Sequence, residues 1–155
     1  MLKKTIIAAA LMAAVAAPAL AQGPVTRTGT GFIANTVTVP AGYETVYFSG
    51  ALPDAPAAGA APMDAEGQSR NVFGKISANL KAQGLTEADV VSMTIYMVGK
   101  DGKPMDFQGM MKGYSAYYGT ATQPNKPTRS TVQVAGLASP TALLEVEVTA
   151  VRKPK

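Results

Sequence analysis

The chain has 155 residues and a formal net charge of +4, and it contains neither cysteine nor histidine. These absences exclude disulfides, Ser-His-Asp and Cys-His catalysis, and metal sites built on histidine or thiolate. No P-loop, calcium loop or GxSxG motif occurs, so we expect no metal and no cofactor. A chain of this length is typical of one domain.

The first 21 residues have the layout of a secretory signal peptide. Lys3 and Lys4 precede the apolar run TIIAAALMAAVAA, Pro18 follows this run, and Ala-Leu-Ala at 19–21 fits a cleavage site. The run is shorter than the roughly 20 apolar residues of a membrane-spanning helix. We therefore expect cleavage after Ala21, export to the periplasm or the medium, no membrane association afterwards, and a single domain over residues 22–155.

The charge of the remaining domain is small. Two of the 14 basic residues and none of the 10 acidic residues lie in the leader, so residues 22–155 carry a net charge of +2. Three of the remaining basic residues, Arg152, Lys153 and Lys155, lie at the C-terminal end. No basic face with interleaved aromatic residues is visible, so the sequence does not favour nucleic-acid binding.

The first half of the domain reads as two strands followed by a helix. The alternating segments 35–42 and 44–52 predict short strands, and the Ala-, Pro- and Gly-rich segment 53–67 predicts a loop. A helix is predicted over 66–83, where Gly84 is placed to end it. Its apolar residues at helical spacing are Val72, Phe73, Ile76 and Leu80.

A strand and a second helix follow. Residues 90–98 alternate as a strand does, and a helix is predicted over 106–118 with Asp106 as its N-cap. Aromatic and Met side chains form a Met and Tyr stripe along one side of this helix, namely Phe107, Met110, Met111, Tyr114, Tyr117 and Tyr118. Such a stripe could face a ligand, but its spacing favours packing against the core.

The last third of the chain predicts a β-hairpin. The segment 121–127 holds two prolines and reads as a loop, and the alternating runs 130–137 and 143–151 follow. The element order predicts an α+β fold, with two helices on one face of a mostly antiparallel sheet. A polar face of such a sheet is usually solvated, but it can also form an oligomer interface that encloses ligand sites. The residues expected on this polar face are Arg129, Thr131, Gln133, Glu145 and Glu147.

The stretch PTRSTVQVAGLASPTALLEV at 127–146 resembles the characteristic segment of the RidA (YjgF/YER057c) family. In that family an arginine between small residues leads into a strand, and an acidic residue follows in the closing strand. The segment VYFSGALP at 46–53 is similar to the family's Ser-Gly strand, and 64–97 resembles its first helix, glycine turn and next strand. The resemblance extends over residues 44–151.

This resemblance implies a chorismate-mutase-like α+β subunit that assembles as a homotrimer, with ligand sites in clefts between subunits. It implies hydrolysis of reactive enamine or imine acids, such as 2-aminoacrylate, to 2-oxo acids and ammonia. By the same resemblance Arg129 binds the substrate carboxylate through its planar fork of donors. Glu145 positions or activates water, backbone groups near Thr131 hold the substrate nitrogen or that water, and Ser49 lines the cleft.

The chain departs from the family pattern at two positions. Thr36 stands near the place of the family's N-terminal tyrosine, and Thr131 stands where a cysteine is frequent. Two other functions remain open, namely a non-catalytic trimer that binds small carboxylates and a holdase or interaction protein. An enzyme needs both Arg129 and Glu145, a binder needs mainly Arg129, and a holdase is indifferent to both.

Overall fold

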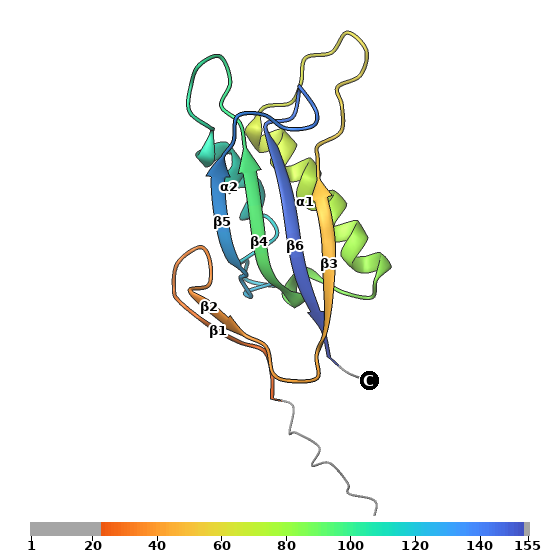
Figure 1. The fold of residues 1–155 in the computed structure, drawn as a ribbon, viewed down its shortest axis with the longest axis vertical. Helices are drawn as coiled ribbons and strands as arrows, with labels where there is room; N and C mark the ends of the chain where they lie inside the picture. The colour runs from red at the N-terminus through yellow and green to blue at the C-terminus, as the bar shows by residue number, and fades with distance from the viewer. Residues whose placement is uncertain (1–22, 154–155) are drawn as a thin grey trace, which may run out of the picture.

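The computed structural model describes residues 23–153, and the predicted signal peptide lies outside this range. The elements run in the order β1 (Thr26–Thr28), β2 (Thr36–Thr38), β3 (Glu44–Ala51), α1 (Ala65–Ala82), the 3₁₀ helix η1 (Glu87–Asp89), β4 (Val90–Met97), α2 (Phe107–Tyr114), β5 (Thr128–Gln133) and β6 (Leu144–Arg152) (Figure 1). Within residues 23–153, neither helix has the length and apolar character needed to cross a membrane.

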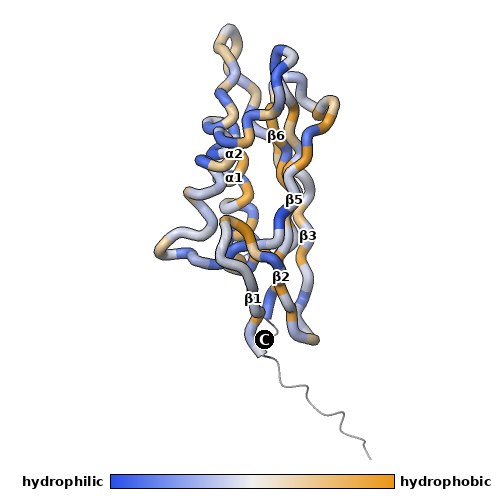
Figure 2. Tube along the Cα trace, turned by 90° about the vertical axis from the view of Figure 1, so that its left-hand side faces the viewer, coloured by the Kyte–Doolittle hydropathy of each residue, from blue (hydrophilic) through white to orange (hydrophobic). Residues whose placement is uncertain are grey.

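The main sheet has four strands in the order β3-β6-β4-β5. The β3–β6 and β6–β4 pairs are antiparallel, whereas β4 and β5 are parallel. Strands β1 and β2 form a separate antiparallel hairpin. Seen from the side, α1 and α2 form one layer and the main sheet forms the other (Figure 2). The predicted α+β fold, with two helices on one face of a mostly antiparallel sheet, is therefore confirmed.

The predicted hairpin between the last two strands is wrong. Strand β6 lies between β3 and β4, and β5 pairs with the other side of β4. The burial of the two strands explains this order. Strand β6 carries a row of buried apolar residues and lies in the middle of the sheet, whereas β5 has no fully buried residue and forms the sheet edge. The connection from 134 to 143 passes the end of β4, where the Val134 amide donates to the Met97 carbonyl and the Val98 amide donates to the Leu143 carbonyl.

The core lies between the helices and the sheet. Helix α1 begins at its N-cap Asp64, whose side chain accepts from the Gly67 amide at 2.8 Å. Its apolar face packs on the inner rows of β4 and β6. The core residues from these three elements are Val72, Phe73, Ile76, Leu80, Val90, Met93, Ile95, Met97, Leu144, Val146, Val148 and Ala150. Burial of apolar area of this kind is the main favourable contribution to folding.

Helix α2 is shorter than predicted and ends at Tyr114. Its N-cap is Asp106, as predicted, and the side chain accepts from the Gly109 amide at 2.9 Å. After Tyr114 the backbone tightens into turns, because the amides of Ala116 and Tyr117 bond to carbonyls three residues back. The predicted packing role of the Met and Tyr stripe is confirmed, since Met110, Tyr114 and Tyr118 are buried in the core.

Candidate functional site

Arg129 lies on the edge strand β5 and points to the helix side of the sheet. It pairs in register with Met93, whose side chain belongs to the buried core. The guanidinium carbon lies 4.4 Å from the centroid of the Tyr114 ring and 5.8 Å from that of Phe107. Both rings come from α2. Because an aromatic face attracts a cation, α2 holds the guanidinium in place at the sheet edge.

The Arg129 guanidinium is incompletely paired. Its Nη1 is buried and has no hydrogen-bond partner among residues 23–153. Burial lowers the pKa of Arg129, and Tyr114 opposes this shift. Arginine nevertheless stays charged at all relevant pH values. Since a buried donor without a partner costs free energy, this atom is suited to meet an anion.

Thr131 lies two residues further along the same side of β5, in register with the buried Ile95. Its Oγ1 is also buried without a hydrogen-bond partner in the described part of the chain. Native proteins pair most buried polar side-chain atoms. Two such atoms therefore lie on one side of one strand, along the β5 edge of the sheet.

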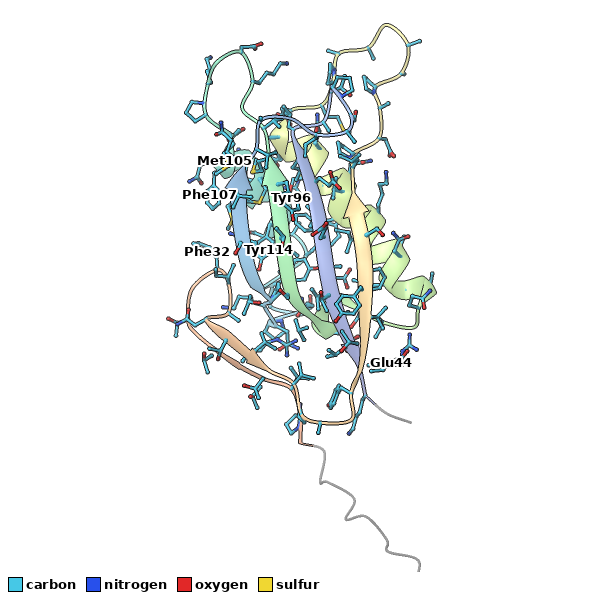
Figure 3. The ribbon with its side chains drawn as sticks, in the orientation of Figure 1. Phe32, Glu44, Tyr96, Met105, Phe107 and Tyr114 are labelled. Atoms are coloured by element: carbon cyan, nitrogen blue, oxygen red, sulfur yellow. The ribbon has the colours of Figure 1, made fainter. Side chains whose placement is uncertain are left out.

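A cavity of about 540 Å³ opens beside Arg129, and we call it the Arg129 cavity. It lies between the β1–β2 connection and α2, and Figure 3 shows Phe32 and Phe107 on the same side of the molecule as Tyr114. The Tyr114 hydroxyl donates to the Phe32 carbonyl at 3.0 Å. The β1–β2 connection is thereby tied to α2. The residues that line the cavity are Phe32, Ile33, Phe107, Gln108, Met111, Lys112, Ser115 and Arg129.

Glu145 lies on β6 and faces the open side of the sheet. It pairs in register with Tyr96, on the face opposite the helices. Its carboxylate rests against Gly50, where a Cβ atom would overlap with it. The register between β3 and β6 shifts here, between Phe48 and Ala51. The missing side chain of Gly50 at this bulge therefore leaves room for the Glu145 carboxylate.

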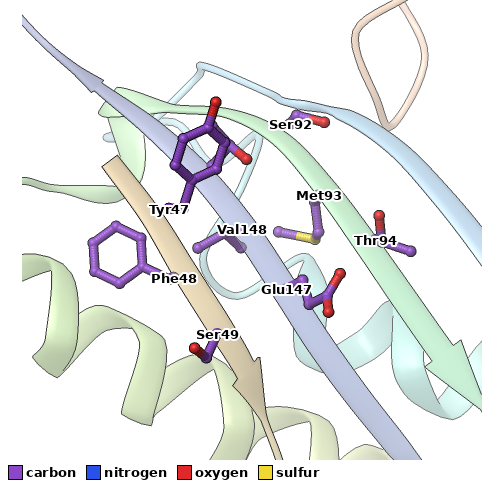
Figure 4. A pocket seen from close by; sticks show the side chains of 9 residues that line it. Tyr47, Phe48, Ser49, Ser92, Met93, Thr94, Glu147 and Val148 are labelled. Carbon is purple, nitrogen blue, oxygen red and sulfur yellow. The ribbon is translucent and has the colours of Figure 1, made fainter. Parts of the chain in front are cut away.

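Ser49 also lies on the open face, one residue before Gly50. It lines a pocket of about 290 Å³ together with Tyr47, Thr94 and Glu147 (Figure 4). The Tyr96 hydroxyl donates to the Glu147 carboxylate at 3.2 Å, and this negative charge raises the pKa of Tyr96. The open face therefore gathers the serine and both carboxylates that the sequence indicated.

The predicted grouping of Arg129 with Glu145 on one face is wrong. The parallel register with β4 places Arg129, Thr131 and Gln133 on the helix side, opposite to Glu145 and Glu147. The error follows from the hairpin prediction, since in a hairpin with β6 the Arg129 side chain was expected on the same face as Glu145. Gln133 has a structural role, because its side-chain carbonyl accepts from the Met105 amide at 2.9 Å.

Sequence reasoning missed the aromatic surroundings of Arg129. Phe107 and Tyr114 appeared only as members of a core stripe, and Phe32 was not singled out. Thr36, near the place of the family's tyrosine, lies in β2 with its hydroxyl 2.7 Å from that of Thr28. The connection of this same hairpin supplies Phe32 to the Arg129 cavity. The aromatic residue Phe32 was the sequence feature that could have indicated this wall of the cavity.

Known proteins resemble this chain in sequence and in structure. A RutC family protein of Haemophilus influenzae is 37% identical over 108 residues, which cover 70% of this chain and 79% of that protein. A 2-iminobutanoate/2-iminopropanoate deaminase of Escherichia coli is 33% identical over 105 residues, covering 68% and 77%. The crystal structure of Escherichia coli TdcF with bound serine has a TM-score of 0.59 and 32% identity, covering 74% of this chain and 85% of that one.

The family comparison agrees with the segment that first indicated it. The endoribonuclease L-PSP family matches residues 35–152, which include β2 to β6 and both sides of the sheet described above. Together with the relatives above 30% identity over two thirds of the chain, this match shows that the protein belongs to the endoribonuclease L-PSP family, which is the RidA (YjgF/YER057c) family.

Proposed function

We propose that the protein is a RidA-type deaminase that hydrolyses reactive 2-imino or enamine acids to 2-oxo acids and ammonia. The observation that carries the proposal is the Arg129 guanidinium, which is held on Tyr114 with a buried and unpaired Nη1. Its planar fork matches a carboxylate. The deaminase name of one relative and the serine bound to another support a ligand of the amino-acid or imino-acid type.

The proposed reaction needs few groups. An enamine acid first tautomerises to the imine, with one proton gained at carbon and one lost from nitrogen. Water then adds to the carbon of the C=N bond, and the resulting carbinolamine expels ammonia as the C=O bond forms. Arg129 holds the carboxylate next to this carbon. The Glu145 carboxylate takes a proton from the attacking water and returns it to the departing nitrogen. Backbone groups at Thr131 and the Ser49 hydroxyl hold the water or the substrate nitrogen.

The proposal places each site between two protomers of a homotrimer. Arg129 and Glu145 lie on opposite faces of one sheet, so a site that uses both takes one from each of two chains. Exposed apolar side chains on the open face support such an interface, because Tyr47 is 79% exposed and Val132 is 42% exposed. Tyr47 lies on β3 and Val132 on β5, so one such side chain stands at each edge of the open face.

We propose export as well. The sequence of residues 1–21 supports a cleaved leader and a periplasmic or secreted domain that starts at Gln22. Expression of the full chain in a bacterium, followed by N-terminal sequencing of the protein in the periplasmic fraction, tests this. A sequence starting at Gln22 is expected, and full-length protein in the cytoplasm would contradict it.

The deaminase is tested by generating imino acids in situ with an amino-acid oxidase and following their disappearance. We expect the wild type to accelerate hydrolysis, and Arg129→Ala and Glu145→Gln each to lower kcat/KM by about 10² or more, as loss of a substrate anchor or general base does. Arg70→Ala is the matched control, because Arg70 is an exposed α1 residue paired with Glu66 at 3.0 Å.

Three outcomes separate the candidate functions. Acceleration that depends on both residues supports the enzyme. Carboxylate binding that depends on Arg129, without acceleration for several amino-acid precursors, supports the non-catalytic binder. Neither activity nor carboxylate binding, together with protection of an unfolding client protein that survives both substitutions, supports the holdase.

A further inference from the structure

We propose that the Arg129 cavity is the side-chain subsite of the deaminase and selects 2-imino acids with large apolar side chains, aromatic or thioether. The inference rests on the proposed function in one respect, namely that Arg129 takes the substrate carboxylate. The cavity then decides which side chain that substrate carries.

The walls of the cavity are mainly apolar. Phe32 and Ile33 come from the β1–β2 connection, and Phe107 and Met111 come from α2. Phe32 is 73% exposed and Phe107 is 36% exposed, although both are large apolar side chains. The cationic head of Lys112 is directed to the Glu66 carboxylate at 3.3 Å. An apolar ligand group would cover the exposed rings and would meet no unpaired lysine.

The cavity also has the position and the size for this role. The Phe107 ring centroid lies 5.8 Å from the Arg129 guanidinium carbon, so a carboxylate bound by Arg129 has an aromatic wall within reach of its side chain. A volume of about 540 Å³ falls within the range of small-molecule sites. A methyl or ethyl group would leave most of this space unused, and each further buried methylene strengthens binding about fourfold.

Hydrogen bonds hold the wall that the β1–β2 connection contributes to the cavity. The β1–β2 connection is anchored by the bond from the Tyr114 hydroxyl to the Phe32 carbonyl, and by one from the Lys126 ammonium to the Gly31 carbonyl at 2.6 Å. The Ala34 amide donates to the Pro127 carbonyl at 2.9 Å. Because the wall is formed before a ligand arrives, less ordering cost opposes binding.

The first test measures binding of two stable carboxylates, 3-phenylpropanoate and propanoate, by calorimetry on protein purified after expression of the full chain. We expect 3-phenylpropanoate to bind at least tenfold more tightly. Phe107→Ala and, separately, Phe32→Ala should reduce the ratio of the two affinities to below threefold, and Arg129→Ala should abolish binding of both. Met63→Ala is the matched control, because Met63 is an exposed apolar residue outside the cavity. Equal affinities in the wild type, or a preference that survives both aromatic substitutions, would overturn the subsite.

The second test measures turnover of imino acids made from phenylalanine, methionine and alanine. We expect kcat/KM to be at least tenfold higher for the first two than for the third, and this preference to be lost in Phe107→Ala. Turnover that favours the alanine-derived imine overturns the subsite and leaves the deaminase standing. Tight binding of 3-phenylpropanoate that depends on Arg129 and Phe107, with no turnover of any imine, overturns the deaminase and leaves the subsite standing.

Discussion

Tyr114 joins the two walls of the Arg129 cavity through one side chain. Its ring lies under the Arg129 guanidinium, and its hydroxyl donates to the Phe32 carbonyl at 3.0 Å. Burial raises the pKa of Tyr114 to about 12, with Arg129 opposing the shift. The hydroxyl therefore stays protonated and able to donate, even at a pH just above 10, where an ordinary tyrosine loses its proton.

Tyr114→Phe should lower the free energy of unfolding by about 1 kcal/mol at pH 8, because one hydrogen bond is lost. Because the pKa of Tyr114 is higher in the folded state than in the unfolded state, the contribution of its protonated hydroxyl to the free energy of unfolding is complete below about pH 10. This contribution is lost as the pH rises toward 12. The deficit of the variant should therefore shrink above pH 10. Urea unfolding of both proteins between pH 8 and 11.5 measures it, and a constant difference over that range would contradict this account.

Gly50 shapes the other half of the proposed site. An added Cβ would overlap with the Glu145 carboxylate, which is the far end of a flexible side chain and can move away. Gly50→Ala should therefore reduce imine hydrolysis by about tenfold or more through displacement of the general base. The free energy of unfolding should fall by less than about 1 kcal/mol, since the overlap is relieved by one rotation.

The effect of Gly50→Ala on activity should depend on Glu145. In the Glu145→Gln background the same substitution should change kcat/KM by less than about threefold, since coupled residues are not additive. Gly136→Ala is the matched control, because no atom lies within 4 Å of a Cβ at that position. A loss of activity of equal size in both backgrounds would show that Gly50 acts independently of the carboxylate.

At the scale of the elements, α1 and α2 are in close contact where Gly113 meets Ser69. The Ser69 hydroxyl donates to the Met110 carbonyl at 2.9 Å, and a Cβ on Gly113 would overlap with the Ser69 side chain and lie 3.0 Å from the Arg70 amide nitrogen. This contact sets how α2 lies over the sheet. Because α2 carries Phe107 and Tyr114, it also sets where Arg129 is held.

Gly113→Ala should destabilise the protein by about 1–2 kcal/mol, because an overpacking cost of about 2–3 kcal/mol against α1 outweighs the roughly 1 kcal/mol that alanine gains over glycine in a helix. Gly74→Ala on α1 is the control. There the added Cβ meets only the Tyr117 hydroxyl oxygen, at 3.3 Å, so the unfolding free energy should stay the same or rise. Denaturant unfolding compares the two, and a more stable Gly113→Ala protein would show that the helix contact tolerates more volume.

The elements were predictable from local patterns, but their partners were not. Helix α1 and strand β4 were predicted to within about one residue, because apolar spacing and caps act within a few residues of chain. The pairing of β5 depends on which strand buries more apolar area across the whole sheet, which no local pattern records. That single error moved Arg129 to the wrong face, although its identity as a candidate came from the motif around it.

At the scale of the whole molecule, the separation of Arg129 from Glu145 is the feature with the largest consequence. One chain presents Arg129 at the edge of its sheet and Glu145 on the open face, beside Gly50. With the roles proposed above, a monomer binds a carboxylate through Arg129 but does not hold the general base next to it. In a closed ring of three protomers each interface is head to tail, so the β5 edge of one chain can meet the open face of the next at all three sites.

Mixing two inactive variants tests this arrangement. Arg129→Ala and Glu145→Gln should each keep about one hundredth of the wild-type activity or less. Unfolding and refolding them together at equal amounts should restore about one quarter of the sites, since half of the protomers supply each intact partner at random. The mass in solution, measured by light scattering, should be three times that of one chain. Recovery depends on pairing an intact Arg129 with an intact Glu145 from different chains. A mixture of Arg129→Ala with Arg129→Lys should therefore remain as inactive as its components, and the absence of recovery in the first mixture, with the trimer intact, would place both residues' functions within one chain.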